Sequence, residues 1–499
     1  MSQNLRPHRT MTTTHDRQLG RRALIGTAWS TVERIGSMVL QFGVNLVLAR
    51  LLLPSDFGYI ALLAIFMALS RVMIDGGLVA ALIQKKDATD NDFSLIFFWN
   101  LALSVLFYGL LYLSAPAIAD FYRLPLLCKV IRIYGLSLIF AALSQVQMAR
   151  LRKNLQFRLI ALINLASYAI AGAIAIALAY AGYGVWALVW VEMGYALFMA
   201  MFYNILSGWR PVLRVSLGAF RQLFSYGGYL LGANLLQEAA KNVQGMIIGY
   251  RFSDYQAGLY SQAHKLDYIN SYALPQALVQ VIFPVYSRIQ DDRERLSAML
   301  GQSVRITAFS IFPLLALLII VADPLIVMLW GEKWLPCATY FRILSVGGMF
   351  VSLQNVNFYA VAARGHSRTL FKWSFYKWGL LLALMGGAMY ISIDAIMWAL
   401  AISNANIYIV NAWLVQRHVG FGIRQQLWSL LPIVTVTAIA SAITVVVNIV
   451  LPFDALSPWL IATGCFTFVL IYLVLSYSFR LRAVDDMKLI VEHIKSKRQ

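Results

Sequence analysis

One short segment occurs twice in this chain, about 200 residues apart, and this near-duplication is the feature that most constrains the fold. Residues 50–59 read RLLLPSDFGY, and residues 251–260 read RFSDYQAGLY. Each copy lies between two long apolar segments, and each second segment ends in Ile-Gln followed by charged residues, at 83–87 and 289–292. Repeated helical lobes are typical of transporters that open one central site alternately to the two sides of a bilayer. The duplication therefore predicts two related lobes around a central site.

The composition indicates a membrane protein. Of the 499 residues, 60% are hydrophobic and only 13% are charged, and the mean hydropathy is +0.69. This leaves too little polar surface to cover a soluble globule of that length. The three cysteines, Cys128, Cys337 and Cys465, lie too far apart in sequence for a zinc-binding pair or a disulfide framework. We therefore expect an all-α integral membrane protein without a metal or a cofactor.

A helix crosses the bilayer core with about 20 apolar residues, and a window of that length gives about fourteen membrane spans. They are expected at residues 24–50, 56–82, 93–117, 127–149, 159–181, 184–206, 223–250, 255–286, 302–330, 338–362, 370–391, 394–415, 428–450 and 457–478. The resulting organisation is a basic N-terminal segment (1–23), an N-lobe of six spans (24–206), a linker (207–222), a C-lobe of six spans (223–415), a loop (416–427), two further spans (428–478) and a basic tail (479–499). The tail reads as a short amphipathic surface helix.

Lysine and arginine orient these spans, because positively charged loops stay in the cytoplasm. Most of the 41 Lys and Arg fall in the N-terminal segment, the tail and the loops that follow even-numbered spans. The opposite loops carry Arg50, Arg123, Lys129, Arg251 and Lys333. Both termini are therefore expected in the cytoplasm, in keeping with an even number of spans. The linker, the loop 416–427 and the tail are expected on the same side.

The net charge of +19 is explained by this orientation signal together with attraction to anionic membrane lipids. The basic residues are scattered among short loops, so no compact domain presents them to a nucleic acid. No loop is long enough to form a soluble catalytic domain, and the sequence has no nucleotide-binding loop or serine elbow. We expect no enzyme activity and no catalytic residues.

Ionisable residues inside membrane spans are costly and normally face a bundle interior or a wet cavity. The candidate cavity cations are Arg34, Arg71, Lys241 and Lys265. The candidate carboxylates, for ion coupling or for pairing, are Glu33, Asp75, Glu192, Glu238 and Asp267. Two interpretations stay open. The cations either attract an anionic headgroup such as a pyrophosphate, or they neutralise carboxylates on the same helix, as Arg71 with Asp75 and Glu238 with Lys241 would.

The seventh and eighth expected spans are unusually polar. Their uncharged polar residues are Asn234, Gln237, Asn242, Gln244, Gln262, Asn270 and Gln276. Such segments are expected to wall an aqueous cavity, with a kink near Pro275. Five tyrosines follow the same stretch, at Tyr250, Tyr255, Tyr260, Tyr268 and Tyr272. These rings either stack against sugars or belong to an interfacial aromatic belt, and His264 is expected to be a cavity or packing residue.

Residues 48–91 carry the run Ala-Arg-Leu-Leu-x-Pro-x-Asp-Phe-Gly, then Asp-Gly-Gly at 75–77 and Ala-Ala-Leu-Ile-Gln at 80–84. This run resembles the signature region of the Wzx-type polysaccharide transporter family, within the superfamily of multidrug, oligosaccharidyl-lipid and polysaccharide exporters. It is most similar to the branch that exports colanic acid and succinoglycan. The resemblance continues at residues 149–157, 257–260 and 363–365.

The resemblance implies two pseudo-symmetric six-helix lobes in a V shape, followed by two extra helices. It also implies a flippase that moves undecaprenyl-pyrophosphate-linked oligosaccharide repeat units across the bacterial inner membrane during lipopolysaccharide or exopolysaccharide biosynthesis. The expected partners are this lipid-linked substrate, anionic membrane lipids and a polysaccharide polymerase or export machinery. The alternative functions are an ion-coupled small-molecule efflux transporter of the same fold and, third, a membrane enzyme of glycan assembly.

Overall fold

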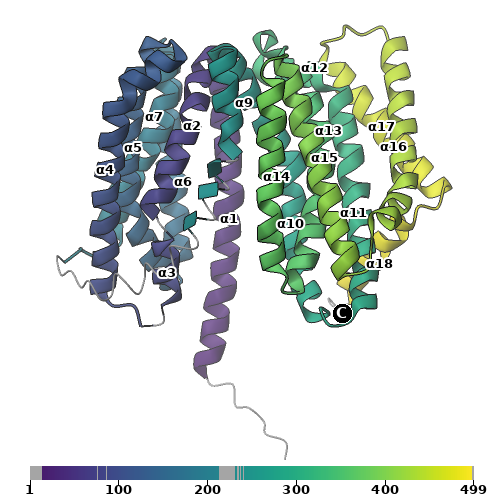
Figure 1. The fold of residues 1–499 in the computed structure, drawn as a ribbon, viewed down its shortest axis with the longest axis horizontal. Coiled ribbons are helices and arrows are strands. Elements are labelled where there is room, and N and C mark those ends of the chain that lie inside the picture. Colours follow the sequence, from purple (N-terminus) through teal and green to yellow (C-terminus); the bar gives the residue numbers. More distant parts are fainter. Residues whose placement is uncertain are drawn as a thin grey trace, which may run out of the picture. The chain divides into compact units, whose positions relative to one another are not determined.

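The computed structural model describes residues 14–75, 77–85, 87–212, 231–232, 235–236, 238–239 and 241–496, and every regular element in these ranges is helical. The chain divides into two compact units, Met1–Met246 (unit 1) and Ile247–Gln499 (unit 2). In Figure 1, purple to teal helices belong to unit 1 and later teal to yellow helices to unit 2.

Unit 1 is a bundle whose centre is α5. Its described helices are α1 (Thr14–Leu51), α2 (Pro54–Asp75), α3 (Leu78–Gln84), α4 (Asp90–Tyr122), α5 (Pro125–Lys153), α6 (Phe157–Tyr180) and α7 (Val185–Leu206). Helix α5 packs against α4 and α7, and α6 packs against α7 and α1. The polar residues considered below project from these helices.

Unit 2 is built around α13. Its elements are α9 (Asp254–Tyr268), the π-helical turn η1 (Ile269–Ala273), α10 (Leu274–Arg288), α11 (Arg293–Ile320), α12 (Ala322–Trp330), the 3-10 turn η2 (Glu332–Trp334), α13 (Cys337–Ala363), α14 (Ser367–Ala388), α15 (Ile393–His418), α16 (Ile423–Val450), α17 (Pro458–Ser478) and α18 (Arg482–Ser496). Helix α13 packs against α9, α10, α11 and α15, and α16 packs against α11 and α17.

Both copies of the repeated segment lie at the start of a helix. In the first, Pro54 opens α2, and the Asp56 carboxylate accepts a hydrogen bond from the backbone N–H of Leu53 at 3.0 Å. In the second, the Ser253 hydroxyl accepts one from the backbone N–H of Gln256 at 3.2 Å and caps α9. Proline in the first turn and a polar cap both favour helix initiation. The repeat therefore marks one helix start in each unit.

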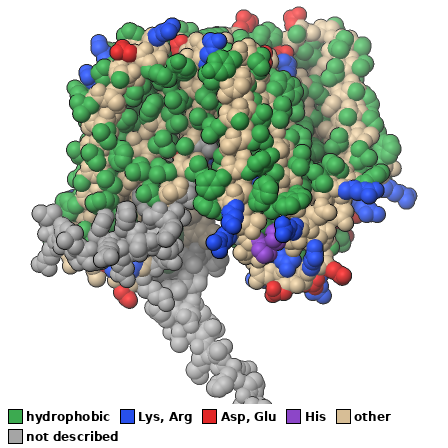
Figure 2. All heavy atoms as spheres, viewed as in Figure 1, with side chains coloured by type: hydrophobic (Ala, Val, Ile, Leu, Met, Phe, Trp, Pro, Cys, Tyr) green, Lys and Arg blue, Asp and Glu red, His purple; other side chains and the backbone are tan. Residues whose placement is uncertain are grey.

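Ten helices in the described ranges are long and apolar enough to cross a membrane. They are α1 from Ile25 onward, α2, α4, α5, α6, α7, α11, α15, α16 and α17. Three further expected spans fall on α9 to α10, on α13 and on α14. Residues 223–230 of the span at 223–250, together with Asn234 and Gln237, lie outside the described residues. In Figure 2, hydrophobic side chains cover most of the visible height, whereas charged side chains gather towards the two ends.

Two expected spans are interrupted where the sequence analysis predicted continuous helices, and a third contains an irregular turn near its expected kink. Residues 56–82 form α2 and the short α3, because the chain turns at Gly77, whose φ is 70°. Residues 302–330 form α11 and α12, which meet at Val321. The eighth span contains η1 immediately before Pro275, near the expected kink. A π-helical turn changes the direction of side chains without ending the helix.

The C-terminal tail forms the expected helix, and this helix packs on unit 2. Helix α18 contacts α11, and Arg305 Nε lies 2.7 Å from Asp486 Oδ2. The two side chains are only 20% and 13% exposed, so this ion pair is shielded from water and screened less than a surface pair. The pair therefore joins the tail helix to the middle of α11.

Candidate functional site

An ion pair between α2 and α7 forms the centre of the candidate site in unit 1. Arg71 Nη2 lies 3.6 Å from Glu192 Oε2. Tyr134 of α5 lies beside the pair and interacts electrostatically with both Arg71 and Glu192. The two charged side chains are 44% and 40% exposed, so they are accessible to a ligand. Pairs this accessible contribute little to stability.

Tyrosine rings surround the Glu192 side of this pair. Tyr168 of α6 and Tyr195 of α7 lie edge to face, with ring centroids 5.3 Å apart, and both interact electrostatically with Glu192. Arginine provides a planar donor fork that suits phosphate, and tyrosine combines an apolar ring with a hydroxyl. Four helices of unit 1 thus present a cation, a carboxylate and three phenols together.

Glu33 is held by a hydrogen-bonded chain in unit 1. Asn164 Nδ2 of α6 donates to Glu33 Oε1 at 2.9 Å, and the Tyr203 hydroxyl of α7 donates to Asn164 Oδ1 at 2.9 Å. These contacts join α1, α6 and α7, so Glu33 has a structural partner other than a cation. The neighbouring Arg34 is exposed, and no carboxylate in the described part of the chain forms an ion pair with it.

Asp75 does not pair with Arg71, which corrects one of the same-helix pairings considered above. Its carboxylate lies beside the backbone N–H groups of Gly77 and Val79. Those groups lie at the start of α3, where the first N–H groups of a helix have no partner within the helix. Asp75 therefore faces the start of α3, and Arg71 pairs instead with Glu192 of another helix.

The second same-helix pairing is present. Lys241 Nζ lies 3.0 Å from Glu238 Oε1, and Asn242 Nδ2 donates to the backbone carbonyl of Glu238 at 2.9 Å. The Lys241 side chain is 47% exposed. The ion pair therefore leaves much of the ammonium group accessible, and pairing along the helix does not prevent contact with an anion.

In unit 2, Asp267 is buried whereas Lys265 is exposed on the same helix. The Ser271 hydroxyl in η1 donates to Asp267 Oδ1 at 2.5 Å. Gly348 of α13 lies against this pair, and a Cβ at Gly348 would come within 1.9 Å of Ser271 Oγ. The close packing of η1 on α13 thus requires glycine here and isolates Asp267 from solvent.

Four aromatic rings form a ladder along α9 and η1 at intervals of four residues. The centroid distances are 5.6 Å from Tyr260 to His264, 6.5 Å from His264 to Tyr268 and 5.0 Å from Tyr268 to Tyr272. Tyr260 is buried, but Tyr268 is 47% exposed. The ladder therefore presents ring faces at the surface of unit 2 close in sequence to Lys265, and His264 belongs to it as a packing residue.

The sequence analysis missed Lys377, which is only 6% exposed within α14. Its ammonium donates to Asn411 Oδ1 of α15, and Asn411 Nδ2 donates to the backbone carbonyl of Gln354 of α13 at 3.1 Å. No described carboxylate forms an ion pair with Lys377. The available signal was a lysine at the centre of an expected span, which indicates an interior position.

The chemistry of these residues is that of binding. Within the described ranges no three His, Cys, Asp or Glu side chains converge to hold a metal ion. The accessible groups are guanidinium, ammonium, carboxylate and phenol, carried by helices. Together they suit a ligand that bears both anionic and hydroxyl-rich groups.

Comparison with solved structures identifies the fold. The structure of the lipid II flippase MurJ in an inward closed conformation matches with a TM-score of 0.71 and 15% identity, over 91% of this chain and 98% of that chain. An inward-facing multidrug resistance MATE family transporter of the MOP superfamily matches with a TM-score of 0.61 and 13% identity, over 77% of this chain and 95% of that chain. The all-α fold is thus like that of these two proteins.

Three curated proteins are similar in sequence over most of their length. The teichuronic acid biosynthesis protein TuaB of Bacillus subtilis is 24% identical, over 78% of this chain and 81% of its own. The succinoglycan biosynthesis transport protein ExoT of Rhizobium meliloti is 25% identical, over 78% and 79%. The lipopolysaccharide biosynthesis protein WzxC of Escherichia coli is 23% identical, over 83% and 85%. The family model described as polysaccharide biosynthesis protein matches residues 47–339, and the chain therefore belongs to the polysaccharide biosynthesis protein family.

Proposed function

We propose that this protein is a flippase that moves undecaprenyl-pyrophosphate-linked oligosaccharide repeat units across the bacterial inner membrane for surface polysaccharide biosynthesis. The observation that carries this proposal is the accessible cluster of Arg71, Glu192 and Tyr134 in a protein of the polysaccharide biosynthesis family. A guanidinium and phenols at one place match the two ends of such a headgroup, which combines a pyrophosphate with sugars. The similarity to transport proteins argues for translocation and against catalysis.

The proposed architecture has fourteen membrane helices in two pseudo-symmetric lobes of six, with two further helices at the C-terminal end. It is supported by the two copies of the repeat, each at a helix start in a different unit, and by a fold like that of MurJ over 91% of this chain. Such lobes expose a central site by rocking against each other. Alternating access is therefore the proposed mechanism.

Within this mechanism each candidate residue has a separate task. Arg34, Arg71, Lys241 and Lys265 attract the pyrophosphate, because cations in a low-dielectric cavity concentrate anions. The exposed rings of the ladder stack against sugars, and Tyr268 is 47% exposed. Glu192, Glu238 and Asp267 are the candidates for ion coupling, whereas the contacts of Glu33 and Asp75 suit structural roles.

Deleting the gene is expected to remove one exported polysaccharide and to leave lipid-linked repeat units on the cytoplasmic face of the membrane. The reason is that polymerisation outside the membrane needs units that have crossed it. The measurement combines surface glycan staining with extraction of lipid-linked saccharides, and a plasmid copy should restore both. Unchanged surface glycan with altered antibiotic tolerance would instead support small-molecule efflux, the alternative function.

The proposed orientation predicts the labelling of single cysteines by a membrane-impermeant thiol reagent. In spheroplasts, cysteines at Ser2 and Ser496 should stay unlabelled and one at Glu332 should react, because positive loops remain inside. The background should lack the three native cysteines. Permeabilised membranes are the control, in which all three introduced cysteines should react. Labelling at either terminus in intact spheroplasts would contradict the orientation.

A further inference from the structure

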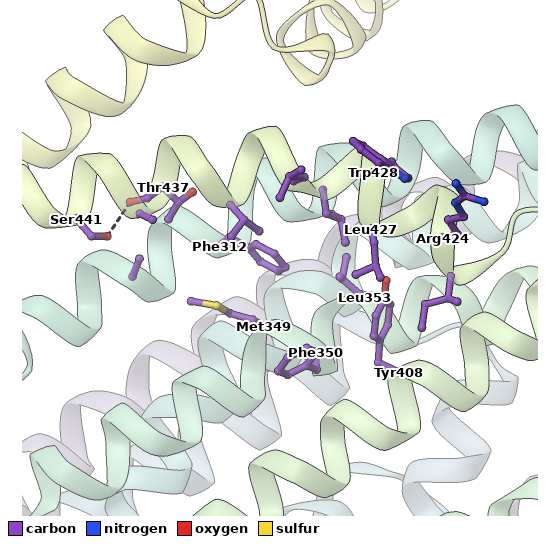
Figure 3. A pocket seen from close by; sticks show the side chains of 16 residues that line it. Phe312, Met349, Phe350, Leu353, Tyr408, Arg424, Leu427, Trp428, Thr437 and Ser441 are labelled. Atoms are coloured by element: carbon purple, nitrogen blue, oxygen red, sulfur yellow. Dashed lines mark hydrogen bonds between the residues drawn. The ribbon is translucent and has the colours of Figure 1, made fainter.

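Unit 2 contains a slot that the proposed transport mechanism does not use. It has a volume of about 820 Å³ and lies between α16 and the helices α11, α13 and α15. Figure 3 shows Arg424 and Trp428 towards one end of the slot and Thr437 and Ser441 towards the other. The side chains between these ends include Phe312, Met349, Leu353 and Leu427.

The slot is apolar along its length. At the Thr437 and Ser441 end of the slot, both hydroxyls already donate hydrogen bonds within α16. Thr437 Oγ1 donates to the carbonyl of Ile433 at 2.8 Å, and Ser441 Oγ donates to the carbonyl of Thr437 at 2.8 Å. The Tyr408 hydroxyl donates to Gln426 Oε1 at 3.0 Å. These groups offer little to a polar ligand, so the interior of the slot suits a hydrocarbon chain.

The Arg424 end of the slot carries one positive charge. Arg424 is exposed, and among the described residues no hydrogen bond or ion pair of its side chain is found. No carboxylate lines the slot. Such a guanidinium binds the phosphate of a net-negative phospholipid in preference to that of a zwitterionic phospholipid, because the ammonium group of the zwitterionic headgroup already balances its phosphate.

The depth of the slot corresponds to one leaflet of a bilayer. From Arg424 to Ser441, α16 rises about 25 Å, and half a bilayer with its headgroups is roughly 20 Å. Trp428 is 67% exposed one turn beyond Arg424, and tryptophan is enriched at the level of lipid headgroups. The charge and the indole therefore mark the headgroup end, and the apolar lining continues to about the bilayer midplane.

We propose that this slot binds an anionic phospholipid of the leaflet at the Arg424 end, with its phosphate on the guanidinium and one acyl chain along α16. The bound chain fills the space between α16 and the bundle of α11, α13 and α15. None of the residues proposed to hold the transported substrate lines the slot. The site is thus distinct from the transport site and does not depend on the proposed function.

The test uses the purified full-length protein. Native mass spectrometry measures lipid binding, and the midpoint temperature of heat-induced aggregation measures the stabilisation of the protein by the lipid. Phosphatidylglycerol is expected to bind with one tight site and to raise the midpoint, whereas phosphatidylcholine should bind at least tenfold more weakly. Arg424→Gln should reduce the preference for phosphatidylglycerol at least tenfold, and Ala438→Trp, which fills the slot, should remove the tight site. Lys372→Gln removes an exposed cation of α14 outside the slot and should bind as the wild type does.

Three results would overturn the proposal. Equal affinity for the two lipids would refute recognition of the anion, and a tight site that persists in Ala438→Trp would place the lipid elsewhere. Binding of undecaprenyl phosphate with the same dependence on Arg424, without binding of phosphatidylglycerol, would make the slot a site for the transported lipid. Lipid binding and glycan export are measured separately. A variant that loses the lipid site but exports glycan normally would therefore leave the proposed flippase function intact.

Discussion

Replacing Arg71 with Gln is expected to reduce glycan export at least tenfold while the abundance of the protein in the membrane stays near that of the wild type. The expected loss follows from the worth of a hydrogen bond to a charged group, about 1.5–3 kcal/mol. Abundance should survive because the Arg71–Glu192 pair is 44% and 40% exposed, and accessible pairs add little to stability. Export is measured as surface polysaccharide per molecule of protein.

Two further variants separate substrate binding from charge balance. If Arg71 only balances Glu192, then the double variant Arg71→Gln with Glu192→Gln should restore export, because it strands no carboxylate. If Arg71 binds the pyrophosphate, export in the double variant should stay low and lie well below that of Glu192→Gln alone, which measures any loss of ion coupling at Glu192. We expect the second result, and recovery of export would contradict the substrate-binding role. Lys129→Gln, an exposed cation of the same unit, should export normally and serves as the matched control.

The sequence was sufficient for features that depend on neighbouring residues. The spans expected to begin at residues 56 and 255 start within the two copies of the repeat, and a helix does start there in each unit. Proline and polar caps act within one turn of a helix. The Glu238–Lys241 pair was predictable because residues three apart share a helix face. The family resemblance at 48–91 lies wholly within the residues matched by the family model, 47–339.

Contacts between distant helices could not be read from the sequence. The partner of Arg71 is Glu192, 121 positions away. The nearer Asp75 lies instead beside backbone N–H groups at the start of α3. The same holds for the packing of η1, whose Ser271 lies against Gly348, 77 positions away on α13. Local spacing proposes partners, but tertiary packing selects among them.

Lys377 shows the same limit most clearly and leads to the prediction with the largest effect on folding. Asn411→Leu is expected to lower membrane abundance strongly and to destabilise the protein by about 3 kcal/mol, because it strands a buried ammonium group. Lys377 is only 6% exposed, and Asn411 Oδ1 is its hydrogen-bond acceptor. Abundance and the midpoint temperature of heat-induced aggregation are the measurements.

The reverse change should be much milder, and this asymmetry tests the assignment. Lys377→Met removes the charge and leaves only the amide oxygen of Asn411 without its partner, which costs about 1 kcal/mol. The double variant Lys377→Met with Asn411→Leu should recover close to wild-type abundance, because apolar groups then replace both partners. Asn406→Leu on the same helix, whose amide reaches Tyr376 only at 3.5 Å, should be tolerated. If Asn411→Leu proved as mild as Asn406→Leu, the ammonium would have another acceptor, and Asn411 would not be what holds Lys377 inside unit 2.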